Sequence, residues 1–328
     1  MEFFDPCQPA VEFEQIVWDH QIEKDLSDLV RLAIWEDLGP SEDVTAKALV
    51  AENAVGSAVM IAKANGVLAG LPAIPEILSQ VDSRLRWQPI RRDGQTVAAG
   101  DVVGYIRGPA RGILSAERVV LNIVGRLSGI ATLTRRYVEA VAGTRSRIFD
   151  TRKTTPGFRR LEKYAVRCGG GWNHRLGLFG GILIKDNHLA ILGGLYPQAT
   201  HGQLAAKAVT LARDYLCQHA AFGEDASPKG KTRLLIEVEV ESLEDLESVL
   251  AAGPDIILLD NMTPDELAHA AQLRNRLNPA VQLEASGGIT LEIVREVALA
   301  GVERISVGAL THSATALDLS LEWVKLSE

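Results

Sequence analysis

The sequence predicts an α/β protein in two parts, an N-terminal α+β half and a C-terminal irregular α/β barrel with fewer than eight strands. The first observation is length, because 328 residues suffice for two domains that each bury a core. The second is a series of short strand patterns separated by turn residues between positions 57 and 107. The third is the alternation of short apolar runs with amphipathic helical patterns after position 145, which is typical of a parallel sheet.

The N-terminal half begins with a helix. Residues 1–20 show no clear period, whereas apolar residues recur at helical spacing from Ile22 until Gly39-Pro40 ends the pattern. A long helix is expected from Ser115 to about Val141, where it joins the two halves. The expected strands between these helices are Ser57–Ala62, Leu85–Ile90 and Val102–Arg107.

The C-terminal half contains six apolar runs that are the expected barrel strands. They are Arg147–Phe149, Ile182–Ile184, Leu234–Val240, Ile256–Leu259, Val281–Glu284 and Arg304–Val307. Helical patterns between them cover Leu204–Leu216, Leu243–Leu250, Pro264–Leu277 and Leu291–Ala300. Six strand-helix units favour an incomplete barrel over the full eight. A last helix over residues 316–328 is expected to join the N-terminal domain, so the expected domains are 1–120 and 121–315.

The composition argues against several classes of protein, among them nucleic-acid-binding, membrane-spanning and secreted proteins. The formal net charge is -8, whereas a nucleic-acid-binding protein is more often basic. No run approaches about 18 consecutive apolar residues, so no membrane span is expected, and the N-terminus lacks the pattern of a secretory signal. The cysteines Cys7, Cys168 and Cys217 are far apart and have neither metal-ligand spacing nor a disulfide pattern. These features predict a cytoplasmic protein with reduced thiols.

Positive charge is concentrated in one stretch of this acidic chain. From Arg145 to Arg175 there are nine Arg or Lys residues and two acidic residues. Such a focused potential suits a site for small anions. Arg152-Lys153 and His174-Arg175 stand beside glycines and turn residues, where side chains often converge on a ligand. The remaining cations are equally well explained by the solvated face of a helix: Arg159, Arg160, Lys163 and Arg167.

Carboxylates follow two neighbouring strands of the expected barrel. Glu237 and Glu239 lie on one face of a strand, because side chains alternate with period 2, and Asp260 ends the next strand. Ligands bind at the C-terminal ends of barrel strands, and single oxygen ligands from adjacent strands suit Mg²⁺ shared with a diphosphate. The alternative is a buried salt bridge to Lys185 or Lys153. For Glu237 this salt bridge is as well supported as metal binding, and for Glu239 and Asp260 it is less well supported than metal binding.

Small-residue turns end the last two strands. Ser286-Gly287-Gly288 is followed by a helical pattern, so backbone N–H groups at a helix N-terminus are expected to face an anion. Gly308 follows the next strand and is expected to complete the same phosphate pocket. Either turn alone could be a simple connection, but their succession on adjacent strands favours phosphate binding.

Several longer motifs occur in order along the chain. They are Ser115-Ala116-Glu117-Arg118, Asp150-Thr151-Arg152-Lys153-Thr154-Thr155-Pro156-Gly157, Asn173-His174-Arg175, Ile184-Lys185-Asp186-Asn187-His188, Glu237-Val238-Glu239-Val240, Leu259-Asp260-Asn261-Met262 and Glu284-Ala285-Ser286-Gly287-Gly288-Ile289. In these motifs the sequence closely resembles the quinolinate phosphoribosyltransferases, the carboxylating nicotinate-nucleotide pyrophosphorylases of NAD synthesis. The resemblance extends from about Ile22 to the end of the barrel.

The resemblance implies a fold, a reaction and an assembly. The fold would be an N-terminal open α/β sandwich followed by a barrel with fewer than eight strands. The reaction would join quinolinate and phosphoribosyl pyrophosphate with Mg²⁺, giving nicotinate mononucleotide, pyrophosphate and carbon dioxide. The assembly would be a homodimer whose active sites contain residues of the partner subunit.

The matched motifs also imply residue roles. The quinolinate carboxylates would be held by Arg152, Lys153, His174 and Arg175, joined by Arg118 of the partner subunit. The ribose, the pyrophosphate and the metal would be addressed by Lys185, Glu239 and Asp260, with Glu239 and Asp260 as metal ligands. The 5′-phosphate would be bound by Ser286, Gly287, Gly288 and Gly308.

The sequence departs from the usual family pattern in one turn. The family usually has an Asp after the motif Gly177-Leu178-Phe179, and this chain has Gly180-Gly181, so a local loop difference near Lys185 is expected. The segments 193–203 and 223–231 are also longer than usual. Two alternatives stay open: a phosphoribosyltransferase of the same fold with another acceptor, and a lyase that forms a Schiff base through Lys185.

Overall fold

The computed structural model describes residues 12–40, 42–219 and 234–324. The chain forms two compact units, each assembled from three stretches. The sandwich unit comprises 15–139, 153–172 and 308–328, and the barrel unit comprises 1–14, 140–152 and 173–307. Both units are therefore discontinuous in sequence. Cys7 and the segment 223–231 lie outside the described residues.

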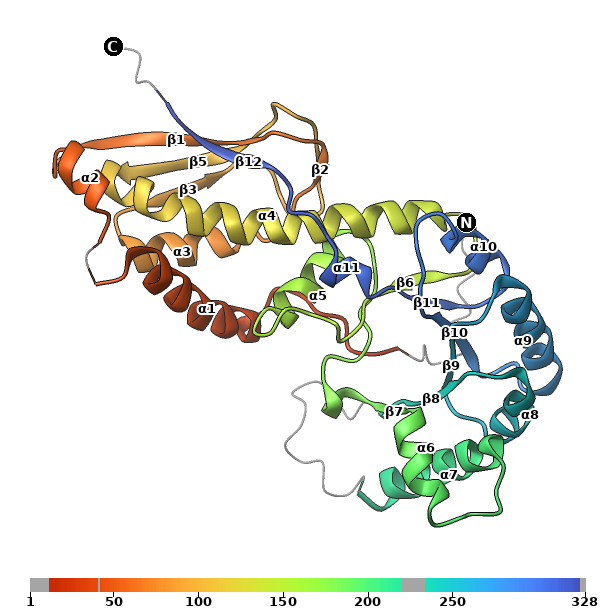
Figure 1. Ribbon diagram of the computed structural model, residues 1–328. Helices are drawn as coiled ribbons and strands as arrows, with labels where there is room; N and C mark the ends of the chain where they lie inside the picture. Colours follow the sequence, from red (N-terminus) through yellow and green to blue (C-terminus); the bar gives the residue numbers. More distant parts are fainter. Residues whose placement is uncertain (1–11, 41, 220–233, 325–328) are drawn as a thin grey trace. The chain divides into compact units, whose positions relative to one another are not determined.

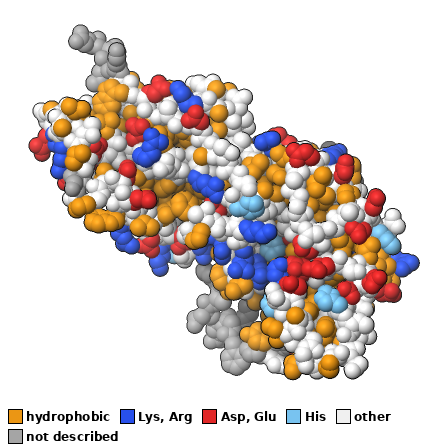
Figure 2. All heavy atoms as spheres, viewed as in Figure 1, with side chains coloured by type: hydrophobic (Ala, Val, Ile, Leu, Met, Phe, Trp, Pro, Cys, Tyr) orange, Lys and Arg blue, Asp and Glu red, His pale blue; other side chains and the backbone are white. Residues whose placement is uncertain are grey.

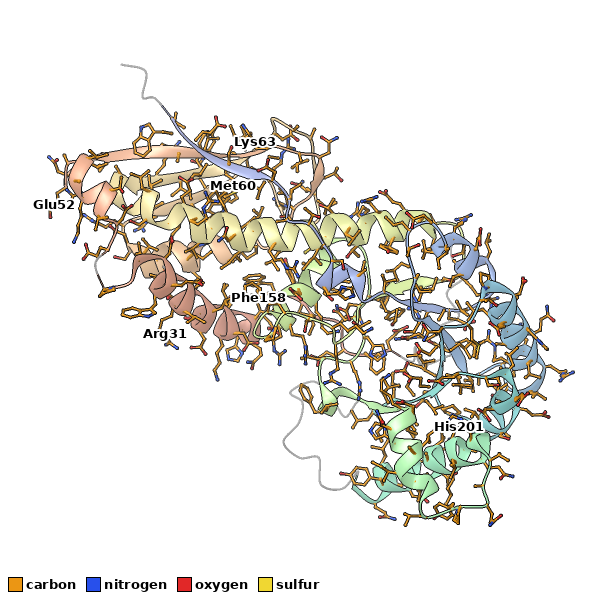
Figure 3. All side chains as sticks on the ribbon, in the orientation of Figure 1. Arg31, Glu52, Met60, Lys63, Phe158 and His201 are labelled. Carbon is orange, nitrogen blue, oxygen red and sulfur yellow. The ribbon has the colours of Figure 1, made fainter. Side chains whose placement is uncertain are left out.

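The sandwich unit is built on a four-stranded antiparallel sheet with the strand order β12-β1-β5-β3 (Figure 1). Its strands are β1 (Val55–Ala62), β3 (Arg86–Pro89), β5 (Val102–Pro109) and β12 (Leu319–Trp323), and a separate pair joins β2 (Gly66–Val67) to β4 (Thr96–Val97). Its helices are α1 (His20–Leu38), α2 (Val44–Leu49), α3 (Ala73–Val81), α4 (Ala110–Ala140), α5 (Arg159–Cys168) and α11 (Ala309–His312). Met60 of β1 is fully buried in this unit (Figure 3).

Helix α1 begins and ends where the sequence pattern predicts. The carboxylate of Asp19 accepts hydrogen bonds from the backbone N–H groups of Gln21 and Ile22, which caps the N-terminus. Ile22 and two further apolar residues at helical spacing are buried on one face. Gly39 ends the helix with a φ of 54°, a conformation that favours glycine.

Helix α4 is continuous through Gly125 and Gly129, although glycine has a low helix propensity. A Cβ at Gly129 would lie 2.1 Å from the carbonyl oxygen of Thr315, and one at Gly125 would lie 3.0 Å from that of Leu317. The two glycines therefore allow the segment before β12 to pass directly against the helix backbone.

The C-terminal segment is a strand, so the helix expected over 316–328 is wrong within the described residues. β12 pairs antiparallel with β1, with Ala58 opposite Trp323 and Ala62 opposite Leu319. Leu317, Leu319 and Leu321 recur with period 2, which is the spacing of a strand with one buried face. Pairing with the open edge of β1 satisfies the backbone groups of the segment and decides its structure.

The barrel unit contains a six-stranded parallel sheet with the order β6-β11-β10-β9-β8-β7. The strands are β6 (Arg147–Phe149), β7 (Ile182–Ile184), β8 (Ile236–Val240), β9 (Ile256–Asp260), β10 (Gln282–Ser286) and β11 (Arg304–Ser306). β6 and β7 are the two edge strands and do not pair with each other in the part of the chain that the structure describes, so the barrel is open between them. All six expected strands and the predicted irregular barrel are thus confirmed.

Helices cover the outer side of this sheet (Figure 1). They are α6 (Asp186–Gly193), α7 (His201–His219), α8 (Leu243–Ala252), α9 (Pro264–Leu277) and α10 (Val294–Leu299), with a short 3-10 turn, η1 (Leu178–Gly180), before β7. His201, at the start of α7, pairs with Asp245 at 2.8 Å (Figure 3). None of the helices in the described ranges combines the length and apolar character that a membrane span needs.

Candidate active site

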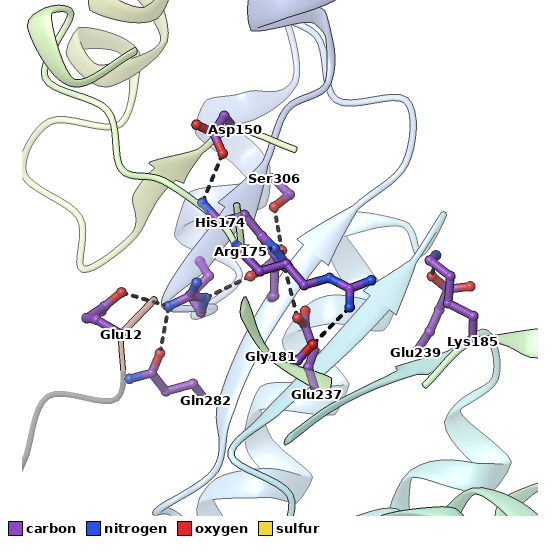
Figure 4. Close-up of polar contacts among 12 residues, drawn as sticks. Glu12, Asp150, His174, Arg175, Gly181, Lys185, Glu237, Glu239, Gln282 and Ser306 are labelled. Atoms are coloured by element: carbon purple, nitrogen blue, oxygen red, sulfur yellow. Dashed lines mark hydrogen bonds and ion pairs between the residues drawn. The ribbon is translucent and has the colours of Figure 1, made fainter. Parts of the chain in front are cut away.

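Asp150 anchors the candidate site at the end of β6. Its side chain is fully buried, and its two oxygens accept hydrogen bonds from the side-chain amide of Asn173 at 2.6 Å and from the backbone N–H of His174 at 2.9 Å (Figure 4). A buried carboxylate needs such donors, because burying a charge without partners is costly. The bonds hold the His174-Arg175 motif beside the end of β6.

His174 lies inside the barrel unit with both ring nitrogens engaged. Its Nδ1 accepts a hydrogen bond from the backbone N–H of Arg175 at 2.8 Å, while its Nε2 lies 2.9 Å from Glu237 and 3.5 Å from Glu284. An accepting Nδ1 carries no proton, so we assign the neutral tautomer with the proton on Nε2, facing the carboxylates. This geometry gives His174 a supporting place behind Arg175.

Arg175 carries the positive charge that this motif directs toward the strand ends. Its guanidinium donates to the backbone carbonyl of Gly181 at 2.9 Å, and its buried Nε has no hydrogen-bond partner among the described residues. Burial lowers the pKa of Arg175 and the nearby cation of Arg152 lowers it further, whereas Glu237 acts in the opposite direction. Two guanidinium groups that repel each other are stabilised by a bound anion.

Lys185 follows β7 and reaches the next strand. Its Nζ forms an ion pair with Glu239 of β8 (Figure 4), and its backbone N–H donates to Nδ1 of His188 at 2.9 Å. Glu237 and Glu239 both face the inside of the barrel, as the period-2 pattern predicts. However, Lys185 pairs with Glu239, while Glu237 faces His174. The sequence supported a buried salt bridge less well for Glu239 than for Glu237, yet the salt bridge to lysine forms at Glu239.

Glu239, Glu241 and Asp260 form a carboxylate group at the ends of β8 and β9. One oxygen from each lies within 4.8 Å of the others, and the face in Figure 2 shows acidic side chains beside basic ones. Burial raises the pKa of Glu239, Lys185 opposes this, and the negative charges of Asp260 and Asp186 add to it. Carboxylate oxygens in excess over nearby cations fit the ligand preference of Mg²⁺. The structure thus brings the two predicted metal ligands together and adds Glu241.

The glycine turn after β10 packs against the end of β9. Gly287 and Gly288 have φ angles of 91° and 61°, and a Cβ at Gly287 would lie 2.1 Å from the side chain of Asn261. The backbone N–H of Asn261 donates to the carbonyl of Ser286 at 2.8 Å. Only glycine fits this close approach. The expected helix start is wrong, because α10 begins at Val294 and a turn separates it from the glycines.

Three predicted site residues belong to the sandwich unit. Lys153 and Gly308 are neighbours there, because a Cβ at Gly308 would lie 3.1 Å from Cδ of Lys153. The hydroxyl of Thr311 donates to the carbonyl of Lys153 at 2.7 Å, which fixes this position. Arg118 is exposed on α4 and lines a surface hollow of about 410 Å³ with Asp43, among other residues.

Polar residues inside the barrel include a pair that the sequence reasoning did not assign. Glu284 and Arg304 are fully buried and paired at 2.7 Å, and the hydroxyl of Ser306 also donates to Glu284. Gln282, Glu284 and Ser286 alternate along β10, and this period-2 pattern of polar residues was the available signal. Such polar faces on successive strands indicate a charged barrel interior.

Family models match most of the chain. Residues 43–128 match Quinolinate phosphoribosyl transferase, N-terminal domain, and residues 130–322 match the C-terminal domain of the same enzyme. The chain belongs to the quinolinate phosphoribosyltransferase family. The resemblance seen in its motifs is thereby confirmed.

Relatives with curated names and a solved structure agree with this membership. The probable nicotinate-nucleotide pyrophosphorylase (carboxylating) of Bacillus subtilis (strain 168) is 41% identical over 288 residues, or 88% of this chain and 89% of that protein. The nicotinate-nucleotide pyrophosphorylase (carboxylating) of Mycobacterium leprae (strain TN) is 41% identical over 297 residues, or 90% and 96%. The structure of the Francisella tularensis nicotinate-nucleotide pyrophosphorylase matches with a TM-score of 0.81 and 34% identity, over 95% of this chain and 100% of that one. This quinolinate phosphoribosyltransferase family member is an enzyme of the pentosyltransferase class.

Proposed function

We propose that the protein transfers the phosphoribosyl group of phosphoribosyl pyrophosphate to quinolinate and releases pyrophosphate and carbon dioxide, giving nicotinate mononucleotide for NAD synthesis. The observation that carries this is the pair of guanidinium groups of Arg152 and Arg175, which lie close enough that the charge of Arg152 adds to the effect of burial and lowers the pKa of Arg175. Planar guanidinium groups bind carboxylates through two parallel hydrogen bonds, so the pair suits a pyridine dicarboxylate. Lys153 is proposed to contribute a third cation, and His174 to hold Arg175 in place.

The chemistry at the ribose is assigned to the carboxylate group and Lys185. As pyrophosphate departs, positive charge develops on the ribose ring, and Glu239 and Asp260 would stabilise it. When bound by Glu239 and Asp260, Mg²⁺ supplies positive charge that neutralises the pyrophosphate. Lys185 would donate a hydrogen bond to the same leaving group. The quinolinate nitrogen becomes cationic on alkylation and accepts the electrons released with carbon dioxide, so the protein mainly positions the reactants.

The 5′-phosphate is assigned to the backbone of the glycine turns. Ser286, Gly287 and Gly288 end β10 with positive φ angles at both glycines, and this conformation allows N–H groups to face an anion. Gly308 follows β11 and lies beside Lys153 in the sandwich unit. We assign Ser286, Gly287 and Gly288 to the 5′-phosphate, and Gly308 keeps the phosphate-binding role that the family motifs imply.

The assembly is proposed to be a homodimer in the cytoplasm, without a membrane or nucleic-acid partner. Arg118 is exposed on α4, so its guanidinium is accessible to a second copy of the chain. Its proposed role is to complete the dicarboxylate site of the partner.

The test is an assay with quinolinate, phosphoribosyl pyrophosphate and Mg²⁺ that measures nicotinate mononucleotide and carbon dioxide together. Equal amounts of both products are expected, and a chelator should stop their formation. A folded protein that forms neither product would contradict the proposal. Nicotinate is the matched control substrate, because it lacks the second carboxylate. Product from another acceptor alone would favour the same-fold alternative.

The Schiff-base alternative is tested at Lys185 directly. An amine must be uncharged to attack a carbonyl, whereas Lys185 is engaged in an ion pair with Glu239. Borohydride treatment with carbonyl substrates is therefore expected to leave Lys185 unmodified, as shown by intact mass and peptide mapping.

A further inference from the structure

Phe13 packs on the face of His174. The two rings are stacked with their centroids 4.4 Å apart and their planes at 30°, and Phe13 is only 4% exposed. Aromatic pairs at this distance are stabilised beyond their buried area. Phe13 comes from a stretch before α1 without any sequence period, so nothing in the sequence indicated that it reaches the barrel interior.

The neighbouring residue fixes this segment to the barrel interior. The carboxylate of Glu12 forms an ion pair with Arg304 at 3.0 Å (Figure 4) and a second one with Arg147. Arg304 is fully buried and also lies 5.3 Å from the Phe13 ring centroid. Because buried ion pairs with several partners restrict each other, Glu12 and Phe13 have a defined position in the barrel unit.

Gly181 connects the same ring to Arg175. A Cβ at Gly181 would lie 2.9 Å from Cε1 of Phe13, and its φ of 155° is one that other residues rarely adopt. The carbonyl of Gly181 accepts the hydrogen bond from the Arg175 guanidinium. Gly181 is also the second residue of the pair Gly180-Gly181 that departs from the usual family pattern. Glycine at this place therefore makes room for Phe13 while its carbonyl aims Arg175.

Phe13 thus touches both residues that hold Arg175. His174 accepts the backbone N–H of Arg175, and Gly181 accepts its guanidinium N–H. We propose that Phe13 is a positioning residue, which aligns Arg175 for dicarboxylate binding through His174 and Gly181. This rests on the proposed function. It extends the site to the N-terminal segment that contains Phe13.

A purely structural role for Phe13 predicts a different outcome. Phe13 also belongs to an apolar cluster with Leu235 and Ile256. If it only fills this core, its replacement should destabilise the protein and affect both substrates equally. If it aligns Arg175, the dicarboxylate should be affected selectively.

The experiment compares Phe13→Leu with Ile256→Val in the full-length protein. Phe13→Leu keeps apolar volume but removes the stack, and is expected to raise the KM for quinolinate by about two- to tenfold with an unchanged KM for phosphoribosyl pyrophosphate. Ile256→Val removes one methyl group from the same cluster and should change neither KM. An equal rise in both KM values, or no rise for quinolinate, would overturn the proposal.

Calorimetric titration with phthalate separates this proposal from the proposed function. Phthalate presents two adjacent carboxylates and needs no turnover, so its Kd is expected to rise in Phe13→Leu by the same factor. If the protein forms no nicotinate mononucleotide yet binds phthalate more weakly in Phe13→Leu, the positioning role stands without the proposed reaction. An equal Kd for phthalate in the parent protein and in Phe13→Leu would refute the positioning role.

A double replacement tests the contact at Gly181. Gly181→Ala is expected to weaken phthalate binding, because its Cβ would displace the Phe13 ring. In Phe13→Ala/Gly181→Ala the ring is absent, so the combined loss should be smaller than the product of the losses measured in the single variants Phe13→Ala and Gly181→Ala. Independent, multiplicative effects would refute the connection from Phe13 through Gly181 to Arg175.

Discussion

Two groups of charged residues in the barrel unit differ in how their charges are compensated. In the interior group, Glu284 and Arg304 are fully buried, and Arg304 bonds to both Glu284 and Glu12. In the mouth group, Arg175 lies near Arg152. Glu239 is paired with Lys185 but also lies near Asp260, so like charges remain close together in both places. The same residue types stabilise the fold where their charges are matched and form a binding site where they are not.

The largest expected effect comes from a substitution that removes the cation of the interior group. Arg304→Met should lower the free energy of unfolding by about 3–5 kcal/mol, because it leaves the carboxylates of Glu284 and Glu12 without their buried cation. Urea denaturation at pH 7 measures this. The matched control is Arg304→Met/Glu284→Gln, which should recover part of the loss. A loss below about 1 kcal/mol for the single variant would show that the interior group does not hold the fold.

The second-largest effect is expected from a substitution in the mouth group. Arg175→Lys should lower kcat/KM for quinolinate by about 10²-fold, since an ammonium cannot bind a carboxylate through two parallel hydrogen bonds. Its unfolding free energy should change by no more than about 1 kcal/mol, because one hydrogen bond to Gly181 is lost. Steady-state kinetics and urea denaturation on one preparation give both values. If Arg175→Lys lost much stability but kept its kcat/KM, the mouth group would stabilise the fold and would not form the binding site.

A third, smaller effect is the pH dependence of stability, which should have opposite signs in the two groups. The pKa of Glu239 is raised above its ordinary 4.5, chiefly by burial, so its contribution is full below that pH and is lost as pH rises through the raised pKa. Burial also acts to raise the pKa of Glu284, but the charge of Arg304 and the hydrogen bonds from Ser306 and Arg304 outweigh it and lower the pKa. Its contribution is present above pH 4.5 and is lost as pH falls through the lowered pKa.

Urea denaturation of Glu239→Gln and Glu284→Gln between about pH 3 and 7 tests these signs. Relative to the parent protein, Glu239→Gln should gain stability as pH rises, whereas Glu284→Gln should lose it. Each unit of pKa difference corresponds to about 1.4 kcal/mol. Parallel pH profiles for the two variants would remove the distinction between the groups.

The smallest effect is expected for a charge outside both groups. Arg31 and Asp28 form an ion pair at 2.8 Å with side chains that are 76% and 64% exposed. Arg31→Ala should change the free energy of unfolding by less than about 0.5 kcal/mol, because water screens such pairs. Thermal denaturation checks this, and a change as large as that of Arg304→Met would show that burial is not what separates the groups.

Periodicity located most elements but failed where two patterns compete. Helix α1 and all six barrel strands follow from spacing, since each has a single buried face or an apolar run of strand length. The segment ending in Trp323 reads both as an amphipathic helix and as an alternating strand. The free edge of β1 selected the strand. Local propensity does not predict pairing with a strand that lies more than 200 residues away in the sequence, as β1 does from β12.

The sequence by itself determined the chemistry of this protein: its motifs supply the cations, carboxylates and glycine turns, and their order identifies the family. The tertiary structure decided which charges compensate each other. It turned His174 toward Glu237 and Glu284, paired Lys185 with Glu239, and brought Phe13 onto His174. Side-chain identity sets what a residue can bind, but partners and burial depend on distances between strands that are far apart in sequence, and those exist only after folding.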